Sequence, residues 1–236
     1  MTQRGGIARQ RQRRAPARWL FCAASALVLT LSSSRAAGAG DTPGEDRPWL
    51  TLSALSGGTQ LDGRLADYQW DTRTHASWGA QALAGRGGFA AGLRFQTSGT
   101  TQDMSAAGVT PSPAVRLDAY EVVGRVRLAE MWANRLHATW SVGRMNLGYH
   151  PDHAAVAVGA GSPVIVTLQP IHEWISGAGI ALERALADRW SLGVVLEYST
   201  FALDTAHRSG AVVVDGRERF GSWNARLELA RVLTWL

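Results

Sequence analysis

Hydrophobic and polar residues alternate with a period of two through most of the chain after Trp49. This period is typical of β-strands whose two faces meet different surroundings, and no stretch sustains the 3.6-residue period of an amphipathic helix. The alternation predicts eight strands, at residues 49–57, 76–84, 88–98, 115–128, 135–147, 171–185, 190–202 and 220–235. The expected fold class is therefore all-β.

The lengths of the connecting segments indicate how these strands are arranged. Long and short connections alternate: residues 58–75, 99–114, 148–170 and 203–219 are long, and residues 85–87, 129–134 and 186–189 are short. A soluble β-sandwich has no reason to lengthen every second connection, whereas an outer-membrane barrel has short periplasmic turns and long extracellular loops. The pattern predicts an eight-stranded antiparallel up-and-down transmembrane β-barrel.

Side-chain size indicates which face of each strand points inward. The apolar faces carry bulky residues such as Trp78, Leu93 and Trp140, and the polar faces are rich in glycine and serine. An eight-stranded barrel has room inside only for its own side chains, so the small polar faces are expected to line the lumen. A soluble lipocalin-type barrel would need the opposite arrangement. The bulky faces would then contact lipid.

Aromatic residues are placed near both ends of the predicted strands. Such rings form girdles at the two interfaces of a membrane barrel. The predicted girdle consists of Trp49, Trp132, Trp190 and Trp235 beside the short turns, and of Tyr120, Tyr149, Trp174 and Tyr198 beside the long loops.

The polar faces also carry charge, and four arginines oppose five glutamates. We expect a lumen charge network formed by Arg94, Glu121, Arg125, Arg127, Glu173, Glu183, Glu197, Arg226 and Glu228. Paired side chains of this kind would plug the barrel, and a gate or narrow ion path is the alternative. Arg231 is an exception, because it falls on the lipid-facing side of the last strand. Either a β-bulge turns it inward or its side chain reaches the headgroups.

The first 39 residues have the composition of an export signal. Seven arginines and no acidic residue occur there, and six of the arginines precede the apolar run Trp19–Leu31, which a small, polar stretch follows. We expect residues 1–39 to be a cleaved signal peptide, residues 40–48 a periplasmic linker and residues 49–236 the barrel domain. All 24 basic residues are arginine. Without residues 1–39 the chain keeps 17 arginines and 19 acidic residues. That negative balance argues against nucleic-acid binding. The only cysteine, Cys22, lies within the apolar run.

The strands, loop lengths, aromatic residues and terminal run Leu227–Leu236 together resemble the small porin-like outer-membrane β-barrels of Gram-negative bacteria. These include the transmembrane domain of outer membrane protein A and the related X and W types, and the resemblance covers residues 48–236. It implies a place in the outer membrane, contact with its lipid and lipopolysaccharide, and recognition of the C-terminal strand by the barrel-insertion machinery. Family members usually end in an aromatic residue, whereas Trp235 is penultimate here.

This fold does not fix a function. We expect a monomer with a structural or surface-interaction role, and the long loops 58–75, 99–114, 148–170 and 203–219 are the candidate contacts for an extracellular ligand. A narrow conduit for small solutes is the alternative, and a lipid A-modifying enzyme is the third hypothesis. The alternation at Val164–Leu168 predicts that the sixth strand extends past the membrane as an edge for strand addition.

Two groups of residues could carry chemistry. His172, Glu173 and Ser176 resemble parts of a lipid A deacylase site, but His and Ser stand four positions apart, where that family has two. Loop residues His150, Asp152 and His153 could hold a metal weakly, but they lack a fourth ligand. We expect no enzymatic activity, no metal and no cofactor.

Overall fold

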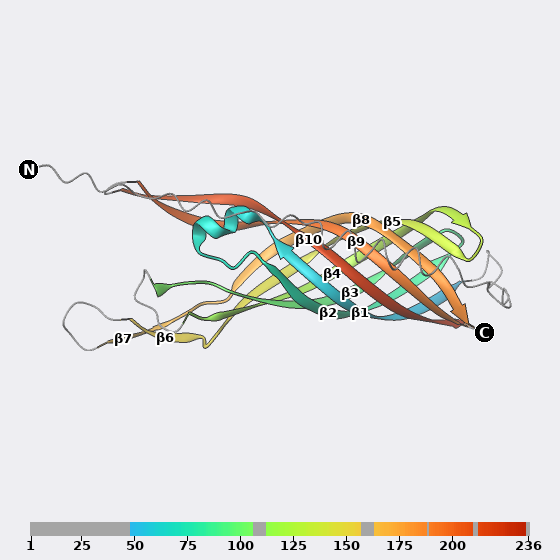
Figure 1. Ribbon diagram of the computed structural model, residues 1–236, viewed down its shortest axis with the longest axis horizontal. Helices are drawn as coiled ribbons and strands as arrows, with labels where there is room; N and C mark the ends of the chain where they lie inside the picture. Colours follow the sequence, from blue (N-terminus) through green and yellow to red (C-terminus); the bar gives the residue numbers. More distant parts are fainter. Residues whose placement is uncertain (1–47, 106–111, 157–162, 188, 210–211, 235–236) are drawn as a thin grey trace, which may run out of the picture. The chain divides into compact units, whose positions relative to one another are not determined.

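The computed structural model describes residues 48–105, 112–156, 163–187, 189–209 and 212–234. The predicted signal peptide and residues 40–47 of the predicted linker lie outside this range. Within it, eight antiparallel strands close into a barrel in the order β1-β10-β9-β8-β5-β4-β3-β2 (Figure 1). The barrel strands are β1 (Trp49–Leu61), β2 (Thr74–Arg86), β3 (Phe89–Thr101), β4 (Ala114–Met131), β5 (Asn134–His150), β8 (Ile171–Ala187), β9 (Trp190–Ser209) and β10 (Val212–Thr234). The predicted fold class is confirmed.

The two faces of each strand differ in exposure, as the alternation predicted. On β3, Leu93 is 67% exposed and its neighbour Arg94 is 4% exposed. On β2, Trp78 is 60% exposed and Ser77 is 3% exposed. The bulky apolar side chains therefore cover the outside of the barrel. No helix in the described ranges is long and apolar enough to cross a membrane.

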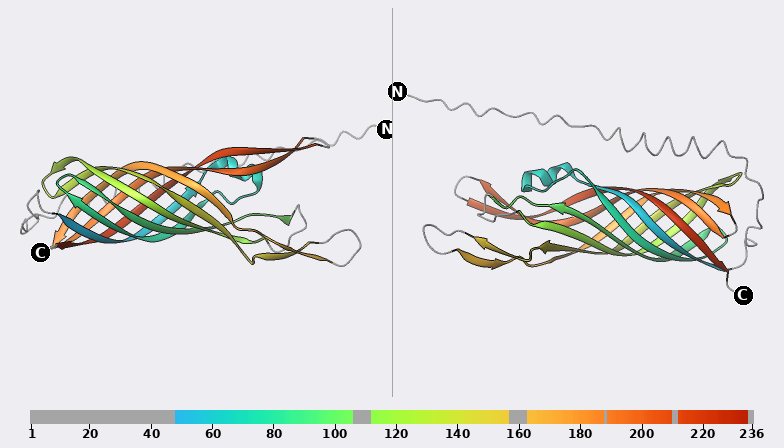
Figure 2. Two further views of the ribbon diagram at one scale, coloured as in Figure 1. Left: turned by 180° about the vertical axis from the view of Figure 1, so that it is seen from behind. Right: turned by 60° about the horizontal axis from the view of Figure 1, so that its bottom comes forward.

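The prediction that residues 203–219 form a long loop is wrong for most of the segment. Residues 203–219 mostly continue β9 and β10 as a paired hairpin, in which Ser209 lies opposite Val212 (Figure 2). The segment contains Val212-Val213-Val214, and β-branched residues favour strands. The long strands β9 and β10 thus extend the barrel wall on the side opposite the short turns.

The predicted extension of the sixth strand is also wrong. Val164–Thr167 forms a separate strand, β7, which pairs with β6 (His153–Val156) in a two-stranded sheet outside the barrel (Figure 2). Strand β8 begins only at Ile171. Pro170 stands immediately before it, and proline cannot donate a hydrogen bond to a sheet ladder. Proline therefore separates the two strands.

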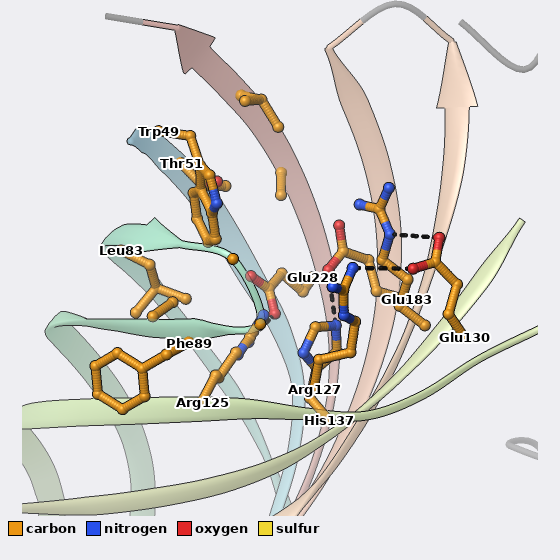
Figure 3. A pocket seen from close by; sticks show the side chains of 16 residues that line it. Trp49, Thr51, Leu83, Phe89, Arg125, Arg127, Glu130, His137, Glu183 and Glu228 are labelled. Atoms are coloured by element: carbon orange, nitrogen blue, oxygen red, sulfur yellow. Dashed lines mark hydrogen bonds and ion pairs between the residues drawn. The ribbon is translucent and has the colours of Figure 1, made fainter. Parts of the chain in front are cut away.

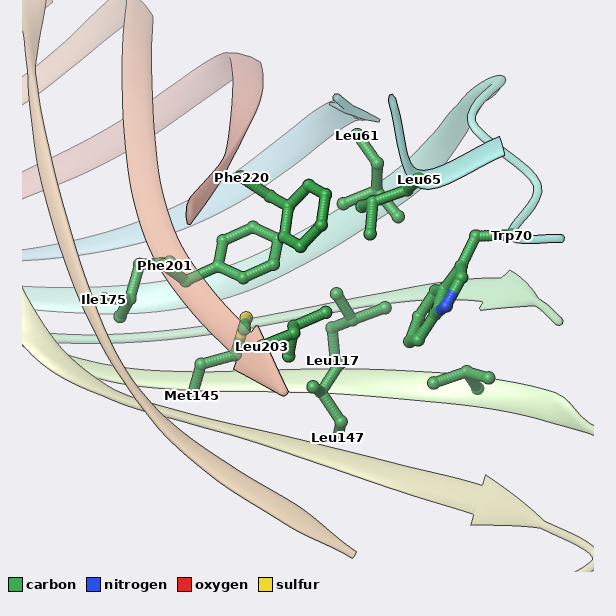
Figure 4. Close-up of a cluster of buried hydrophobic side chains, with 11 residues drawn as sticks. Leu61, Leu65, Trp70, Leu117, Met145, Leu147, Ile175, Phe201, Leu203 and Phe220 are labelled. Atoms are coloured by element: carbon green, nitrogen blue, oxygen red, sulfur yellow. The ribbon is translucent and has the colours of Figure 1, made fainter. Parts of the chain in front are cut away.

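The lumen at the long-loop end is apolar, which the sequence did not lead us to expect. Inward side chains from six barrel strands pack there around Phe201 and Phe220 (Figure 4). The short 3-10 helix η1 (Gly63–Tyr68) adds Leu65, which is 1% exposed, and Trp70 follows it. We call this set the apolar cap: Leu61, Leu65, Trp70, Val115, Leu117, Met145, Leu147, Ile175, Phe201, Leu203 and Phe220. The rule of a small polar interior therefore fails at this end. It also fails near the short turns, where buried Leu83 and Val123 belong to a second apolar cluster.

Candidate functional site: the charged lumen

Four charged side chains meet in the middle of the lumen, and we call them the central cluster: Arg94, Glu121, Glu197 and Arg226. Arg94 Nη1 and Nη2 donate to the two carboxylate oxygens of Glu197 at 2.9 and 2.6 Å. Its Nε donates to Glu121 at 2.8 Å, and Arg226 Nη2 lies 3.1 Å from Glu197. All four side chains are at most 2% exposed. Two cations and two anions therefore neutralise each other out of contact with solvent.

Neutral polar side chains continue the cluster toward the long loops. Arg226 donates to Gln96, and Gln96 donates to Asn224 at 3.1 Å. Asn224 also accepts from Thr59 at 2.8 Å. These hydrogen bonds satisfy part of the polar surface around the charges, which helps to stabilise a buried ion pair. Glu121 Oε1 and Arg226 Nε have no hydrogen-bond partner among the described residues.

A second ion pair lies nearer the short turns. Arg125 on β4 pairs with Glu228 on β10, and both side chains are at most 8% exposed. Glu228 also accepts from Ser53 at 2.7 Å and from Gln81 at 3.2 Å. In the barrel order, β4 and β10 are four strands apart in either direction, as are β3 and β9. The Arg125–Glu228 and Arg94–Glu197 pairs therefore both cross the full width of the lumen.

The lumen opens into a cavity of about 130 Å³ at the short-turn end (Figure 3). On one side of it, Glu130 accepts from Arg127 at 2.9 Å and from Arg135 at 3.4 Å. His137 Nε2 lies 3.4 Å from Glu183. These ionic groups are more exposed than the central cluster, so solvent weakens their attraction.

The predicted network is thus divided among several levels of the barrel. Arg94, Glu121, Glu197 and Arg226 come together, and Arg125 and Glu228 form the next layer. The remaining three have partners that the alternation did not identify: Arg127 binds Glu130, Glu183 faces His137, and Glu173 binds Arg217 near the long loops. Arg217 was missed because it lies in a predicted loop. Gln81, Gln96 and Asn224 share the inward parity and could have been found from it.

The predicted aromatic girdle is only partly on the outer surface. Tyr120, Trp174, Trp190 and Tyr198 are exposed there, and Trp132 is 95% exposed at a turn. Trp49 differs from the prediction, because it packs inward beside Leu83 and lines the cavity at the short turns. Tyr149 also differs, because it shares the inward parity of Leu147 and packs against the apolar cap. Trp235 lies outside the described residues.

Of the two alternatives for Arg231, the structure shows the outward position and no β-bulge. Arg231 is exposed and stands opposite Trp190 and Leu52. Its guanidinium lies over the Trp190 ring, 5.6 Å from the ring centre. A cation stacked on an aromatic ring at a barrel rim is tolerated more easily than one at the midplane.

The two candidate chemical sites are not assembled. His172 Nδ1 is 2.8 Å from Asn146 and Ser176 Oγ is 3.3 Å from Thr200, so each has a different partner, and Glu173 binds Arg217. His153 Nδ1 lies 2.7 Å from Asp152 Oδ1. Among the residues that the structure describes, no group of three His, Cys, Asp or Glu side chains could hold a metal ion.

A closed eight-stranded barrel with an apolar outer surface and a charged lumen is the architecture of a membrane barrel. The fold is that of a small outer-membrane β-barrel. No protein-family model matches the chain, and no curated protein is similar enough to count as a relative.

Several solved outer-membrane structures are similar in fold. Neisserial surface protein A is 8% identical, with 77% of this chain and 96% of that chain covered and a TM-score of 0.47. A major outer membrane protein from Thermus thermophilus is 10% identical, with 78% and 99% covered and a TM-score of 0.45. Ail, the attachment invasion locus protein of Yersinia pestis, is 11% identical, with 78% and 97% covered and a TM-score of 0.38.

Proposed function

We propose that the protein is a monomeric outer-membrane barrel with a sealed, charge-plugged lumen, which acts structurally or through contacts at its long-loop end. In this proposal residues 1–39 direct export and are cleaved off. Residues 40–48 form a periplasmic linker to the barrel, and the short turns face the periplasm. Outer-membrane lipid and lipopolysaccharide surround the barrel, and the C-terminal strand guides its insertion.

The observation that carries the proposal is the pair of ion pairs that cross the lumen. Arg94–Glu197 and Arg125–Glu228 each join opposite walls of the barrel. A solute passing between them would have to separate buried opposite charges, and leaving one buried charge unpaired costs roughly 3–5 kcal/mol. The apolar cap forms a further barrier on the long-loop side, because it offers a hydrated ion no polar partners.

Single-channel recording of the purified protein in planar bilayers tests this proposal. We expect no steady conductance from the wild type. We expect measurable conductance when both lumen-crossing pairs are removed, by Arg94→Ala/Glu197→Ala with Arg125→Ala/Glu228→Ala, in combination with Phe201→Ala/Phe220→Ala. Electrophoresis with and without boiling shows in parallel that each variant is a folded barrel. A steady wild-type conductance from heat-modifiable protein would contradict the sealed lumen.

A narrow conduit for small solutes is the second candidate. A cavity of about 380 Å³ at the long-loop end, lined by Trp70, Tyr149 and Leu203 among others, favours it. Uptake of small apolar and polar solutes into liposomes, compared between wild type and Trp70→Ala, distinguishes the two functions. A sealed barrel gives no uptake with either protein.

The proposal also includes no enzymatic role. The separated partners of His172 and Ser176 support this part of it. Hydrolysis of lipid A by the pure protein, lost in Ser176→Ala, would contradict it.

The β6–β7 hairpin is the best candidate for contact with an extracellular ligand. It is detached from the barrel ladder, and Ile165 is 73% exposed on it. A pull-down from extracellular matrix or host-cell extracts with the wild type and with a variant lacking residues 150–168 tests this. Unchanged capture by the deletion variant would exclude the hairpin.

A further inference from the structure

One arginine on the outside of the barrel has an unusual environment. Arg144 lies on the outward face of β5, and its neighbours across the two strand pairs are Tyr120 on β4 and Trp174 on β8. Its guanidinium lies over the Trp174 ring, 4.3 Å from the ring centre. Tyr120 and Trp174 are 53% and 60% exposed, so the three side chains form one open band.

Arg144 has no acidic partner among the residues that the structure describes. Within the described ranges no carboxylate forms an ion pair with it, whereas Arg94, Arg125 and Arg226 inside the lumen all have one. Arg116, an exposed arginine on the neighbouring strand β4, pairs with Asp118 at 2.9 Å. Stacking on Trp174 stabilises the cation in part, and a lipid headgroup or water can supply acceptors for its N–H groups.

Further polar groups lie one step closer to the long loops. Asn146 and His172 stand opposite each other on β5 and β8, both outward, with their side chains 2.8 Å apart. They are two residues beyond Arg144 and Trp174 along the same strands. Diagonal neighbours on adjacent strands, such as Arg144 and His172, lie about 7–8 Å apart, and one lipid headgroup can span this distance.

On the other side of Arg144 the surface is apolar. Val122 and Val142 stand opposite each other two residues deeper and are 46% and 42% exposed. A ligand with a phosphate beside Arg144 and an acyl chain over the two valines would match both parts. This continuity selects a lipid over free phosphate.

We propose that Arg144, with Trp174 and Tyr120 beside it, binds the phosphate of an outer-leaflet lipid headgroup, with His172 and Asn146 as additional polar contacts. The guanidinium presents parallel N–H groups that match two phosphate oxygens, and such charged hydrogen bonds are about twice as strong as neutral ones. The inference rests on the proposed membrane orientation, in which the long-loop end faces the outside.

Native mass spectrometry of the full-length barrel in detergent tests this, with diphosphoryl lipid A and its dephosphorylated form as probes. We expect the wild type to retain diphosphoryl lipid A, and Arg144→Gln to lower its apparent affinity about tenfold or more, as loss of a charged hydrogen bond predicts. Dephosphorylated lipid A should bind both proteins equally weakly. Arg231→Gln is the matched control, because it removes an outward arginine stacked on a tryptophan at the opposite rim.

The outcomes separate the two proposals. Equal binding by wild type and Arg144→Gln, or an equal loss in Arg231→Gln, overturns the headgroup site. Displacement of the lipid by millimolar inorganic phosphate alone also overturns it, since free phosphate would then be the ligand. Electrophoresis without boiling and protease protection in liposomes report whether the barrel inserts. Failure there rejects the membrane proposal itself, whereas insertion without selective binding rejects only the site at Arg144.

Discussion

Arg94 and Glu197 join opposite walls of the barrel through two parallel hydrogen bonds of 2.9 and 2.6 Å. They are 103 positions apart in the chain and lie on β3 and β9, which are separated by the same number of strands in both directions. Glu197 also neutralises Arg226 at 3.1 Å. One carboxylate therefore holds two buried guanidinium groups, which makes it the most sensitive point of the lumen.

Replacing this carboxylate by an amide should be costly. Glu197→Gln leaves Arg94 with only Glu121 and leaves Arg226 without a charged partner, so we expect a loss of roughly 3–5 kcal/mol in the free energy of unfolding. Urea unfolding in lipid vesicles, followed by tryptophan fluorescence, measures it. The control is Glu130→Gln, because the Glu130 side chain is 38% exposed and an exposed pair contributes about 1 kcal/mol or less. Equal losses of unfolding free energy in both variants would show that the central cluster stabilises the barrel no more than an exposed ion pair does.

Gly177 tests the rule that small residues line the lumen. A Cβ atom at this position would lie 2.8 Å from Ser199 Oγ, 2.9 Å from Ser141 Oγ and 3.0 Å from Glu197 Oε1. We expect Gly177→Leu to destabilise the barrel by about 1–3 kcal/mol through overpacking beside the central cluster. The adjacent Ala178 is exposed on the outer face, so Ala178→Leu should change stability little. A small effect of both substitutions would mean that the lumen has unused space.

The alternation of residue types was sufficient to predict the barrel and the faces of its strands. A strand has only two faces, so a bulky apolar residue such as Leu93 and a charged neighbour such as Arg94 determine the orientation together. Parity placed Arg231 on the lipid-facing side but left open whether a β-bulge turns it inward. It could not predict which charges meet, because pairing across the lumen depends on strand order and stagger. His137 was therefore missed as the partner of Glu183. Glu130 and Arg217 were missed because they lie in the predicted connections 129–134 and 203–219.

The long-loop end was the least predictable part. Its lumen is filled by inward apolar residues such as Phe201 and Phe220. Both lie near the ends of predicted strands, where an apolar residue on the polar face breaks the alternation. The 3-10 helix that contributes Leu65 depends on a local cap, in which Asp62 accepts from the Arg64 backbone. Such interactions involve single hydrogen bonds and leave little periodic signal in a sequence.

The β6–β7 hairpin should be dispensable for folding. Its strands pair only with each other, four residues each, and they form a sheet separate from the barrel. Deleting residues 153–167 and closing the gap with a short Gly-Ser linker should leave the unfolding midpoint and the heat-dependent gel shift unchanged. A matched deletion within β9, residues 203–207, removes barrel-wall residues that pair with β10 and should lower both. A lowered midpoint in the hairpin variant would show that it supports the barrel.

Asp71 should make the first long loop sensitive to acid. Hydrogen bonding to the Arg73 side chain lowers the pKa of the Asp71 carboxyl to about 2, from an ordinary value of 3.8. The Asp71 backbone also bonds Thr100 and Thr101 on β3, at 2.7 and 2.9 Å. Because the folded-state pKa is depressed, the stabilisation is complete above pH 4 and is lost as the pH falls toward 2. Amide hydrogen exchange at residues 62–73 should therefore rise over that interval, while the barrel strands stay protected. Asp71→Asn should exchange at a rate independent of pH after correction for intrinsic rates, and a wild-type profile equally flat would show that the ion pair does not hold the loop.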